Sequence, residues 1–308
     1  MKYDLTIIGT GYVGLVSGAC FADIGHNVIC VDKDKRKIDA LKKGIIPIYE
    51  PGLKEIVARN VKNGRLRFTT QLELEKANAV FLAVGTPTDP KTDNADMSMF
   101  FAAAKEVAAK LKHRCLIVTK STVPVGTGAQ LKKIFGNKAN VASNPEFLRE
   151  GNAVHDFMNP DRIVVGTYTP NCAKFLQNLY KPIKAPFMAT DVVSAELIKY
   201  AANTFLAAKV VFINEMADLC EAMGADVDEV AKGMGLDERI GNKFLKTGPG
   251  IGGSCFPKDA RALAVQAQNH GYPSHIIEAL IESNDLRKEN SALPHFLFDT
   301  GGHVLFAK

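Results

Sequence analysis

The 308-residue sequence lacks features that mark several classes of protein. No stretch approaches the roughly 20 consecutive apolar residues that span a bilayer. The short apolar run near the start lies between charged residues and has no cleavage site, so we expect neither a membrane segment nor a signal peptide. The 38 basic and 33 acidic residues leave a net charge of +5, and the basic ones are spread along the chain. This distribution argues against nucleic acid as a partner and favours an anionic small molecule.

Cysteines are few and never paired in the sequence. There is no Cys-x-x-Cys pair and no zinc-like spacing of cysteine and histidine, so we expect no metal site and a reducing, cytoplasmic location. Most of the cysteines are expected to be small buried hydrophobic residues. The six are Cys20, Cys30, Cys115, Cys172, Cys220 and Cys255.

The first half of the chain alternates apolar strands with helical stretches. Strands are expected at 4–8, 27–31, 66–69, 79–84, 115–119, 141–143 and 162–165, with helices at 97–111 and 172–180 among others. This alternation predicts an α/β fold of Rossmann type with a doubly wound parallel sheet. Ligands bind such sheets beyond the carboxyl ends of the strands, which here carry residues 85–88, 120–124 and 144–148.

A glycine-rich turn follows the first expected strand. In Gly9-Thr10-Gly11-Tyr12-Val13-Gly14, the first glycine permits the turn, the second admits a pyrophosphate to the backbone, and the third lets helix and strand pack closely. Asp32 ends the next strand, 18 residues beyond Gly14, where a carboxylate can accept hydrogen bonds from ribose hydroxyls. We therefore expect a dinucleotide site.

Asp32 argues for NAD over NADP, because a carboxylate repels a ribose 2′-phosphate. The basic residues after it complicate this choice, since one of them can accommodate that phosphate. They are Lys33, Lys35, Arg36 and Lys37. The alternative interpretation is a solvated first helical turn capped by Asp34.

The second half of the chain is mostly helical. Residues 191–223 contain neither proline nor glycine and predict one helix of roughly 50 Å that bridges domains or subunits. Lys199 and Asn203 share a face of it, one turn from Glu196. We expect a nucleotide-binding domain at 1–190, the connecting helix at 191–223, and a helical central and dimerisation domain at 224–300.

A second glycine-rich segment surrounds Cys255. Residues 246–254 contain four glycines and one proline, a composition suited to close backbone contact with a ligand. An ordinary cysteine thiol has a pKa of roughly 8.5 and is only slightly ionised at neutral pH, so a reactive thiol needs cationic or amide stabilisation. Lys258 and the loop amides are the neighbouring candidates. A thiol beside a dinucleotide site points to oxidation through a covalent thiohemiacetal.

Three motifs, together with the fingerprint, carry a resemblance to a known family. They are Ser121-Thr122-Val123-Pro124-Val125-Gly126-Thr127, Ser143-Asn144-Pro145-Glu146-Phe147-Leu148, and Phe244-Leu245-Lys246 followed by Gly252-Gly253-Ser254-Cys255-Phe256-Pro257-Lys258-Asp259. In this order they resemble the UDP-glucose 6-dehydrogenases among the nucleotide-sugar dehydrogenases, from the N-terminus to about Arg287.

The resemblance implies that the primary alcohol of UDP-glucose is oxidised twice, consuming two NAD+ and one water, to give UDP-glucuronate for polysaccharide biosynthesis. Cys255 would hold the intermediate aldehyde as a thiohemiacetal and then a thioester. By position in the motifs, Lys199 and Asn203 would stabilise the oxyanion, Asp259 and Thr122 would hold the catalytic water, and Glu146 would assist thioester hydrolysis.

The resemblance also implies binding residues and a homodimer built around the long helix. Cofactor contacts would come from Gly9, Gly11, Tyr12, Val13, Gly14, Asp32, Lys37, Thr86, Thr122, Glu150 and Lys258. Substrate contacts would come from Glu146, Phe147, Leu148, Lys199, Asn203, Arg239, Phe244, Lys246 and Gly252, with Arg239 reaching the neighbouring subunit's substrate.

The resemblance further implies a third domain that encloses the uridine. We expect residues 301–308 to be the truncated start of that domain, with Val304 and Leu305 lacking a sheet to join. Two alternatives to UDP-glucose oxidation follow: a catalytically impaired NAD-binding remnant, or a dehydrogenase acting on GDP-mannose or UDP-N-acetylmannosamine. The Phe244-Leu245-Lys246 and Pro145-Glu146-Phe147-Leu148 runs favour the glucose enzyme.

Overall fold

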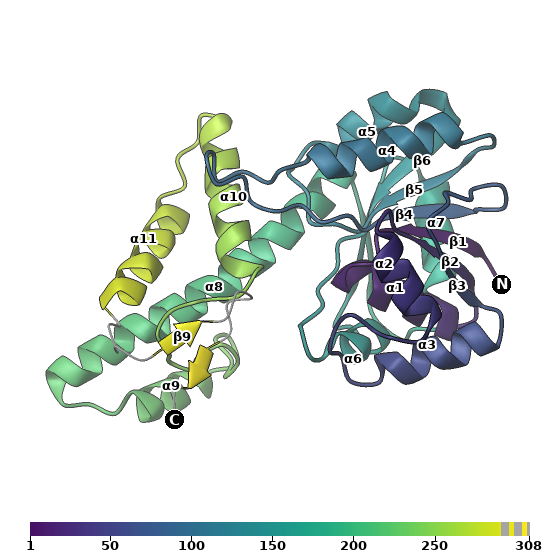
Figure 1. Ribbon diagram of the computed structural model, residues 1–308. Helices are drawn as coiled ribbons and strands as arrows, with labels where there is room; N and C mark the ends of the chain where they lie inside the picture. Colours follow the sequence, from purple (N-terminus) through teal and green to yellow (C-terminus); the bar gives the residue numbers. More distant parts are fainter. Residues whose placement is uncertain (291–295, 299–303, 307–308) are drawn as a thin grey trace. The chain divides into compact units, whose positions relative to one another are not determined.

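The computed structural model describes residues 1–290, 296–298 and 304–306. The chain divides into two compact units (Figure 1). Unit 1 comprises residues 1–87 and 96–199, and unit 2 comprises residues 88–95 and 200–308. The boundary near residue 200 falls inside one continuous helix, α8 (Val192–Met223).

Unit 1 is built on an eight-stranded sheet with the order β3-β2-β1-β4-β5-β6-β7-β8. Its strands are β1 (Asp4–Ile8), β2 (Asn27–Val31), β3 (Leu66–Thr69), β4 (Ala79–Leu82), β5 (Cys115–Thr119), β6 (Ala139–Ser143), β7 (Ile163–Thr167) and β8 (Phe187–Thr190). The strands alternate buried side chains between the two faces, so Ile7 packs toward one helical layer while Val80 packs toward the other.

Helices cover both faces of this sheet, as Figure 1 shows. One layer contains α1 (Tyr12–Asp23), α2 (Lys35–Lys42), α3 (Leu53–Lys62), α6 (Ala153–Met158) and α7 (Pro170–Leu179). The other contains α4 (Ser98–Lys110) and α5 (Thr127–Phe135), which is followed by a short 3₁₀ turn at Gly136–Lys138. The predicted α/β class with a doubly wound sheet is therefore confirmed.

The sheet departs from the prediction at one end. β7 runs antiparallel to β6, with Ala142 opposite Thr167, and then pairs in parallel with β8. The expected all-parallel sheet is therefore wrong for β7, and β8 was not predicted. Strand direction depends on how the following connection returns to the sheet, which hydrophobic patterning alone does not encode.

The long helix forms almost as predicted. It begins at Val192, where the preceding Asp191 accepts a hydrogen bond from the Ser194 amide at 2.8 Å, as an N-cap residue does. Within the described part of the chain, none of the helices combines the length and apolar character required to cross a membrane.

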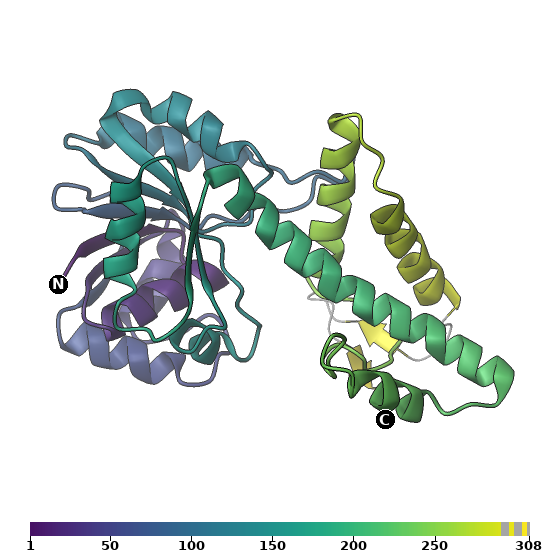
Figure 2. The same cartoon turned by 180° about the vertical axis from the view of Figure 1, so that it is seen from behind.

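Unit 2 is helical around the second part of α8 (Figure 2). It contains α9 (Val227–Gly235), α10 (Phe256–Asn269) and α11 (His275–Asn290). A small core joins Ala207 and Val211 of α8 to Ile251, Ala260 and Leu280. The second half of the chain is mostly helical, as predicted, although the individual helix α11 was not predicted.

The expected third domain falls largely on residues outside the description, which omits 291–295, 299–303 and 307–308. The described backbone of β9 (Phe296–Phe298) and β10 (Val304–Phe306) forms an antiparallel pair. Val304 and Leu305 therefore pair their backbone groups with β9, while their assignment to the start of a third domain stays a prediction.

Candidate active site

The glycine-rich turn connects β1 to α1 with little space around it. Gly9 has a φ of +101°, and a Cβ there would lie 2.4 Å from the Ala83 carbonyl oxygen. A Cβ on Gly14 would lie 2.1 Å from the Gly9 carbonyl oxygen. A Cβ on Gly11 would meet no atom within 4 Å, so its backbone is open to a ligand. The turn therefore has the close helix packing and the open amide face of a pyrophosphate cradle.

We expect Gly14→Ala to weaken dinucleotide binding by more than tenfold, because α1 must move away from the Gly9 carbonyl and take its N-terminal amides with it. Gly11→Ala should leave the fold unchanged, since its Cβ meets open space. NAD affinity and stability of both variants are measured by NAD titrations that monitor the shift in melting temperature. Equal affinity in Gly14→Ala and wild type would contradict the expectation.

Asp32 follows β2 and faces the turn. Its Oδ2 accepts hydrogen bonds from the Thr10 amide at 2.8 Å and the Thr10 hydroxyl at 2.7 Å, and its Oδ1 accepts from the Asp34 amide at 3.0 Å. Burial acts to raise the pKa of Asp32, but these donors together hold it below its usual value. The ionised carboxylate suits ribose hydroxyls and opposes a 2′-phosphate, so the residues present fit NAD.

The basic residues after Asp32 are exposed and lie just before α2 or in its first turn. Asp34 caps this helix, accepting from the Arg36 amide at 2.9 Å. Lys33 pairs with Glu106, and Lys35 pairs with Asp39. Lys37 is exposed and adds to the positive potential at Asp32. The capped, solvated first turn is thus observed, and Lys37 remains a predicted cofactor contact.

Tyr12 ties the turn to the loop before α6. Its hydroxyl donates to Glu50 Oε2 at 2.7 Å and also lies 2.9 Å from the Arg149 carbonyl oxygen. Burial and the neighbouring Glu50 carboxylate raise the pKa of Tyr12. Glu50 also accepts from the Gly151 and Ala153 amides, at 3.0 and 2.6 Å. Sequence reasoning missed Glu50, for which the only local signal is the Pro51-Gly52 turn that follows it.

The other predicted cofactor residues of unit 1 differ in exposure. Val13 is half-buried in the first turn of α1. Thr86 is buried after β4, and its hydroxyl donates to the Thr122 carbonyl at 2.8 Å, which joins the two strand-end turns. Thr122 is half-buried and Glu150 is exposed.

A buried ion pair lies at the carboxyl end of β6. Lys199 Nζ on α8 is 3.0 Å from Glu146 Oε1, and their side chains are only 6% and 8% exposed. Glu146 Oε2 accepts from the Leu148 amide at 2.6 Å. Two cations lie near the Phe147 ring, with Arg162 Cζ 3.9 Å and Lys199 Nζ 5.4 Å from its centroid. Arg162 was not predicted, because this stacking joins residues 15 positions apart.

Glu196, one turn before Lys199, binds the start of α5. Its two carboxylate oxygens accept from the Gly126 and Gly128 amides, each at 2.7 Å. The helix has no side-chain cap of its own at Gly126. Glu196 therefore supplies that cap from α8 and fixes the end of the loop that carries Thr122.

Burial raises the pKa of Glu196 to about 7, and the two amide donors act in the opposite direction. Because this pKa lies above that of an unfolded glutamate, the folded state binds more protons at intermediate pH, and stability should fall as pH rises to about 7. We expect the unfolding free energy of wild type, relative to Glu196→Gln, to drop by about 2–3 kcal/mol between pH 5 and 8. Urea titrations at each pH measure it; a relative stability that rises with pH would contradict it.

Cys255 is the exposed thiol of the chain, and the other five cysteines are buried. It is the N-cap residue of α10, so its sulfur lies where a helix end carries partial positive charge. Ser254 Oγ is 3.6 Å from its Sγ. The helix N-terminus was missed in the sequence, although Pro257 in the first turn is a typical start signal.

Asp259 lies one turn after Cys255 and is 1% exposed. Its Oδ2 accepts from Asn203 Nδ2 at 2.6 Å, and its Oδ1 accepts from Lys258 Nζ at 2.7 Å. Asn203 is itself buried on α8. A carboxylate that accepts hydrogen bonds from both an amide donor and an ammonium group is fixed in orientation. Unit 2 thus brings together four predicted residues: Cys255, Asn203, Lys258 and Asp259.

The glycine-rich loop before Cys255 is held by side chains of α8 and α11. Asn214 Oδ1 accepts from the Gly248 amide at 2.8 Å, while Arg287 Nε donates to the Gly248 carbonyl at 2.8 Å. Asn284 Oδ1 accepts from the Ile251 amide at 2.6 Å. These three were missed as site residues, because nothing local marks an asparagine or an arginine that binds a loop more than thirty residues away.

The predicted substrate residues of unit 2 lie at or near this loop. Phe244, which has a φ of +64°, packs its ring edge-on against Phe256 at 6.0 Å. Lys246 and Gly252 are exposed. Arg239 is exposed and pairs with Asp237 at 2.6 Å. The predicted residues thus form two groups, one in each unit.

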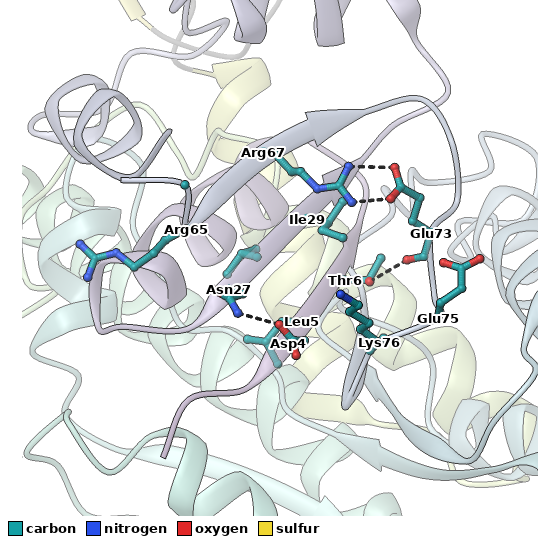
Figure 3. A pocket seen from close by; sticks show the side chains of 13 residues that line it. Asp4, Leu5, Thr6, Asn27, Ile29, Arg65, Arg67, Glu73, Glu75 and Lys76 are labelled. Carbon is teal, nitrogen blue, oxygen red and sulfur yellow. Dashed lines mark hydrogen bonds and ion pairs between the residues drawn. The ribbon is translucent and has the colours of Figure 1, made fainter. Parts of the chain in front are cut away.

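A cavity of about 410 Å³ in unit 1 contains none of the predicted residues (Figure 3). It lies at the amino ends of β1 and β2, opposite the end that carries the glycine turn. Its polar groups bond one another, with Arg67 paired to Glu73 and Asn27 donating to Asp4 at 2.7 Å. Within the described residues, no cluster of three or more His, Cys, Asp or Glu side chains is placed to hold a metal ion.

The fold and these groups define a dinucleotide-dependent dehydrogenase in which a helical unit carries an exposed thiol. Comparisons with known proteins specify the family. Residues 3–184 match the NAD binding domain of the UDP-glucose/GDP-mannose dehydrogenase family, and residues 193–286 match its central domain. The chain belongs to this family of NAD-dependent oxidoreductases, and NAD is the cofactor of the domain matched by its N-terminal part.

Individual relatives agree with this family. The chain is 53% identical to a UDP-glucose 6-dehydrogenase of Rhizobium meliloti, covering 92% of this chain and 68% of the relative. It is 51% identical to a UDP-glucose 6-dehydrogenase from Bacillus subtilis, over 92% of this chain and 63% of that relative. The structure of a UDP-glucose dehydrogenase from Pyrobaculum islandicum superposes with a TM-score of 0.88 at 41% identity, covering 93% and 68%. The chain therefore spans about two thirds of the length of these relatives.

Proposed function

We propose that this protein oxidises UDP-glucose to UDP-glucuronate in two steps, with Cys255 as the covalent nucleophile. The observation that carries the proposal is that Cys255 is the exposed thiol and lies at the N-terminus of α10, while the other cysteines are buried. The relatives named above supply the substrate, since they are UDP-glucose dehydrogenases.

NAD+ supplies the hydride acceptor in both steps when it is bound. The first oxidation converts the primary alcohol to an aldehyde, and the Cys255 thiolate adds to its carbonyl carbon to form a thiohemiacetal. Lys199 and Asn203 are assigned to the developing oxyanion, for which preorganised donors contribute about 3–4 kcal/mol each. Loss of a second hydride and a proton leaves a thioester on Cys255.

Hydrolysis then frees the thiol. Asp259 and Thr122 are assigned to hold the water, and Glu146 to accept its proton as the water attacks the thioester carbon. The carbon–sulfur bond breaks, Cys255 leaves as a thiolate, and the acid is released. The balance is UDP-glucose, two NAD+ and one water on one side, and UDP-glucuronic acid, two NADH and two protons on the other.

The test is an assay of the purified protein with UDP-glucose and NAD+, in which NADH absorbance is compared with sugar consumed. Two NADH per sugar supports the proposal, and one or none contradicts it. GDP-mannose and UDP-N-acetylmannosamine are assayed in parallel, because a faster reaction with either would replace the assigned substrate. Protein that binds NAD+ but oxidises none of the three would be the impaired remnant.

We further propose that the protein acts as a homodimer in the cytoplasm. Large apolar side chains follow one face of the second part of α8, at Phe205, Phe212, Leu219 and Met223, and they are 42% to 77% exposed. Six cysteines without a Cys-x-x-Cys pair among them suit a reducing compartment. Light scattering should give twice the chain mass, and Phe212→Glu should give the monomer; a wild-type monomer would reject the dimer.

A further inference from the structure

Lys120 is a buried lysine that the proposed reaction does not use. It follows β5, is 5% exposed, and donates from Nζ to Asn144 Oδ1 at 3.1 Å and to the Tyr180 hydroxyl at 3.4 Å. Within the described residues, no carboxylate forms an ion pair with it. The rings of Phe157 and Tyr180 lie about 6 Å from its Nζ. The ammonium group is therefore surrounded by neutral partners.

The partners of Lys120 form a closed network. The Tyr180 hydroxyl also donates to Asn144 Oδ1, at 2.5 Å. Asn144 Nδ2 donates to the Val164 carbonyl at 2.8 Å, which ties β6 to β7 beyond the last paired residue of that short antiparallel ladder. The side chain of Asn144 thus has its oxygen fixed by two donors and its amide fixed by one acceptor, so this point of the backbone has a single stable position.

Glu146 lies two residues beyond Asn144, separated only by Pro145. Proline has a fixed φ, which restricts the backbone between Asn144 and Glu146. The Glu146 carboxylate accepts hydrogen bonds from the Lys199 ammonium at 3.0 Å and from the Leu148 amide at 2.6 Å. Both contacts require Glu146 to keep the position that the buried network gives it.

A buried cation without a carboxylate partner lowers stability. Burial lowers the pKa of Lys120 to about 8; attraction to Glu146 acts in the opposite direction, and repulsion from Lys199 adds to the shift. The other titratable groups near the network are Tyr180 and, beside it, Cys20 on α1. Because burying this cation without an ion pair is costly, a lysine at this position points to a role other than stability.

We propose that Lys120, through Asn144 and Tyr180, is a positioning residue for Glu146 and thereby for hydrolysis of the Cys255 thioester. The expected effect on hydrolysis rests on the proposed function. The effect on the position of Glu146 rests on the hydrogen-bond network alone. The effect of Lys120 should be largest on hydrolysis, because the network holds the segment that carries Glu146, the residue assigned to that step.

The first test follows hydrolysis. In Lys120→Met the first turnover should form NADH at a rate near wild type, while hydrolysis slows about tenfold or more. The thioester should then accumulate and be visible in the intact mass of the protein. The ratio of hydrolysis rates, wild type over variant, should fall as pH rises through about 8, where Lys120 loses its proton in wild type. Lys133→Met, on the exposed face of α5, is the control and should match wild type throughout.

The second test needs no substrate. The Leu148 amide donates to Glu146, so its hydrogen exchange reports the position of that carboxylate. Exchange should be about tenfold faster in Lys120→Met, faster to a smaller extent in Tyr180→Phe, and unchanged in Lys133→Met. Tyr180→Phe serves if Lys120→Met fails to fold.

Unchanged Leu148 exchange in the folded variants would overturn the inference, as would equal slowing of both oxidation steps. If wild type oxidises no sugar nucleotide but the exchange rates respond as expected, the proposed function fails and the positioning role stands.

Discussion

Cys255→Ala is expected to stop formation of UDP-glucuronate, with a loss of about 10⁴-fold or more in the rate of acid production. The variant keeps the NAD binding domain and Asp259, but it has no sulfur to hold the aldehyde between the two oxidations. A little NADH from a reversible first oxidation is the most it should form. NAD affinity should not change, because the substitution leaves the glycine turn and Asp32 as they are.

The matched control is Cys220→Ala. Cys220 is a buried cysteine on α8, and its thiol should act as a small hydrophobic group without a chemical role. It should retain activity within about twofold of wild type. Acid production is measured by chromatography of the sugar nucleotides and NADH by absorbance. Substantial acid from Cys255→Ala would remove the covalent mechanism, whatever the fate of Cys220→Ala.

Lys199→Met is expected to destabilise the protein by about 3–5 kcal/mol, because it leaves the Glu146 carboxylate buried without its cation. Glu146→Gln in the same chain should restore most of that loss, since a neutral amide beside methionine has no charge to desolvate. Oxidation should fall by about 10²–10⁴-fold in both the single and the double variant, because both lack the ammonium group.

Urea unfolding at pH 7 measures the two stabilities. The exposed pair Lys35 and Asp39 gives the control: Lys35→Met should cost less than about 0.5 kcal/mol, as solvated i,i+4 pairs do. A double variant no more stable than Lys199→Met would show that the pair is not the source of the loss, and that α8 is instead damaged by the methionine itself.

The sequence predicted the parts of the site that local chemistry encodes. The glycine turn, Asp32 and the capping role of Asp34 depend on residues within one strand-turn-helix unit, and all three take the expected places. The long helix followed from an uninterrupted run without glycine or proline. Cys255 stood out because a thiol in a glycine-rich loop is chemically unusual, and its exposure separates it from the other cysteines.

Contacts between distant segments were beyond the sequence. Arg162 over Phe147, Glu196 on the α5 amides, and Asn284 on Ile251 each join residues whose proximity is set by the packed fold. Their side chains are ordinary polar residues at ordinary helix or loop positions, and no spacing marks them. The reversal of β7 was missed for the same reason, since both strand directions present the same alternation of apolar residues.

The Glu50 carboxylate has a consequence for ligand binding. It accepts hydrogen bonds from the Tyr12 hydroxyl and from the Gly151 and Ala153 amides. Glu50 therefore joins the first turn of α1 to the loop that follows Phe147 and Leu148. A dinucleotide that orders the first turn of α1 will therefore also order the loop after Leu148. Thermodynamic reciprocity requires that a ligand bound at this loop raise the affinity for the dinucleotide by the same factor. Cofactor and sugar nucleotide are therefore expected to bind with positive cooperativity, which Glu50→Gln would diminish without removing a contact to either ligand.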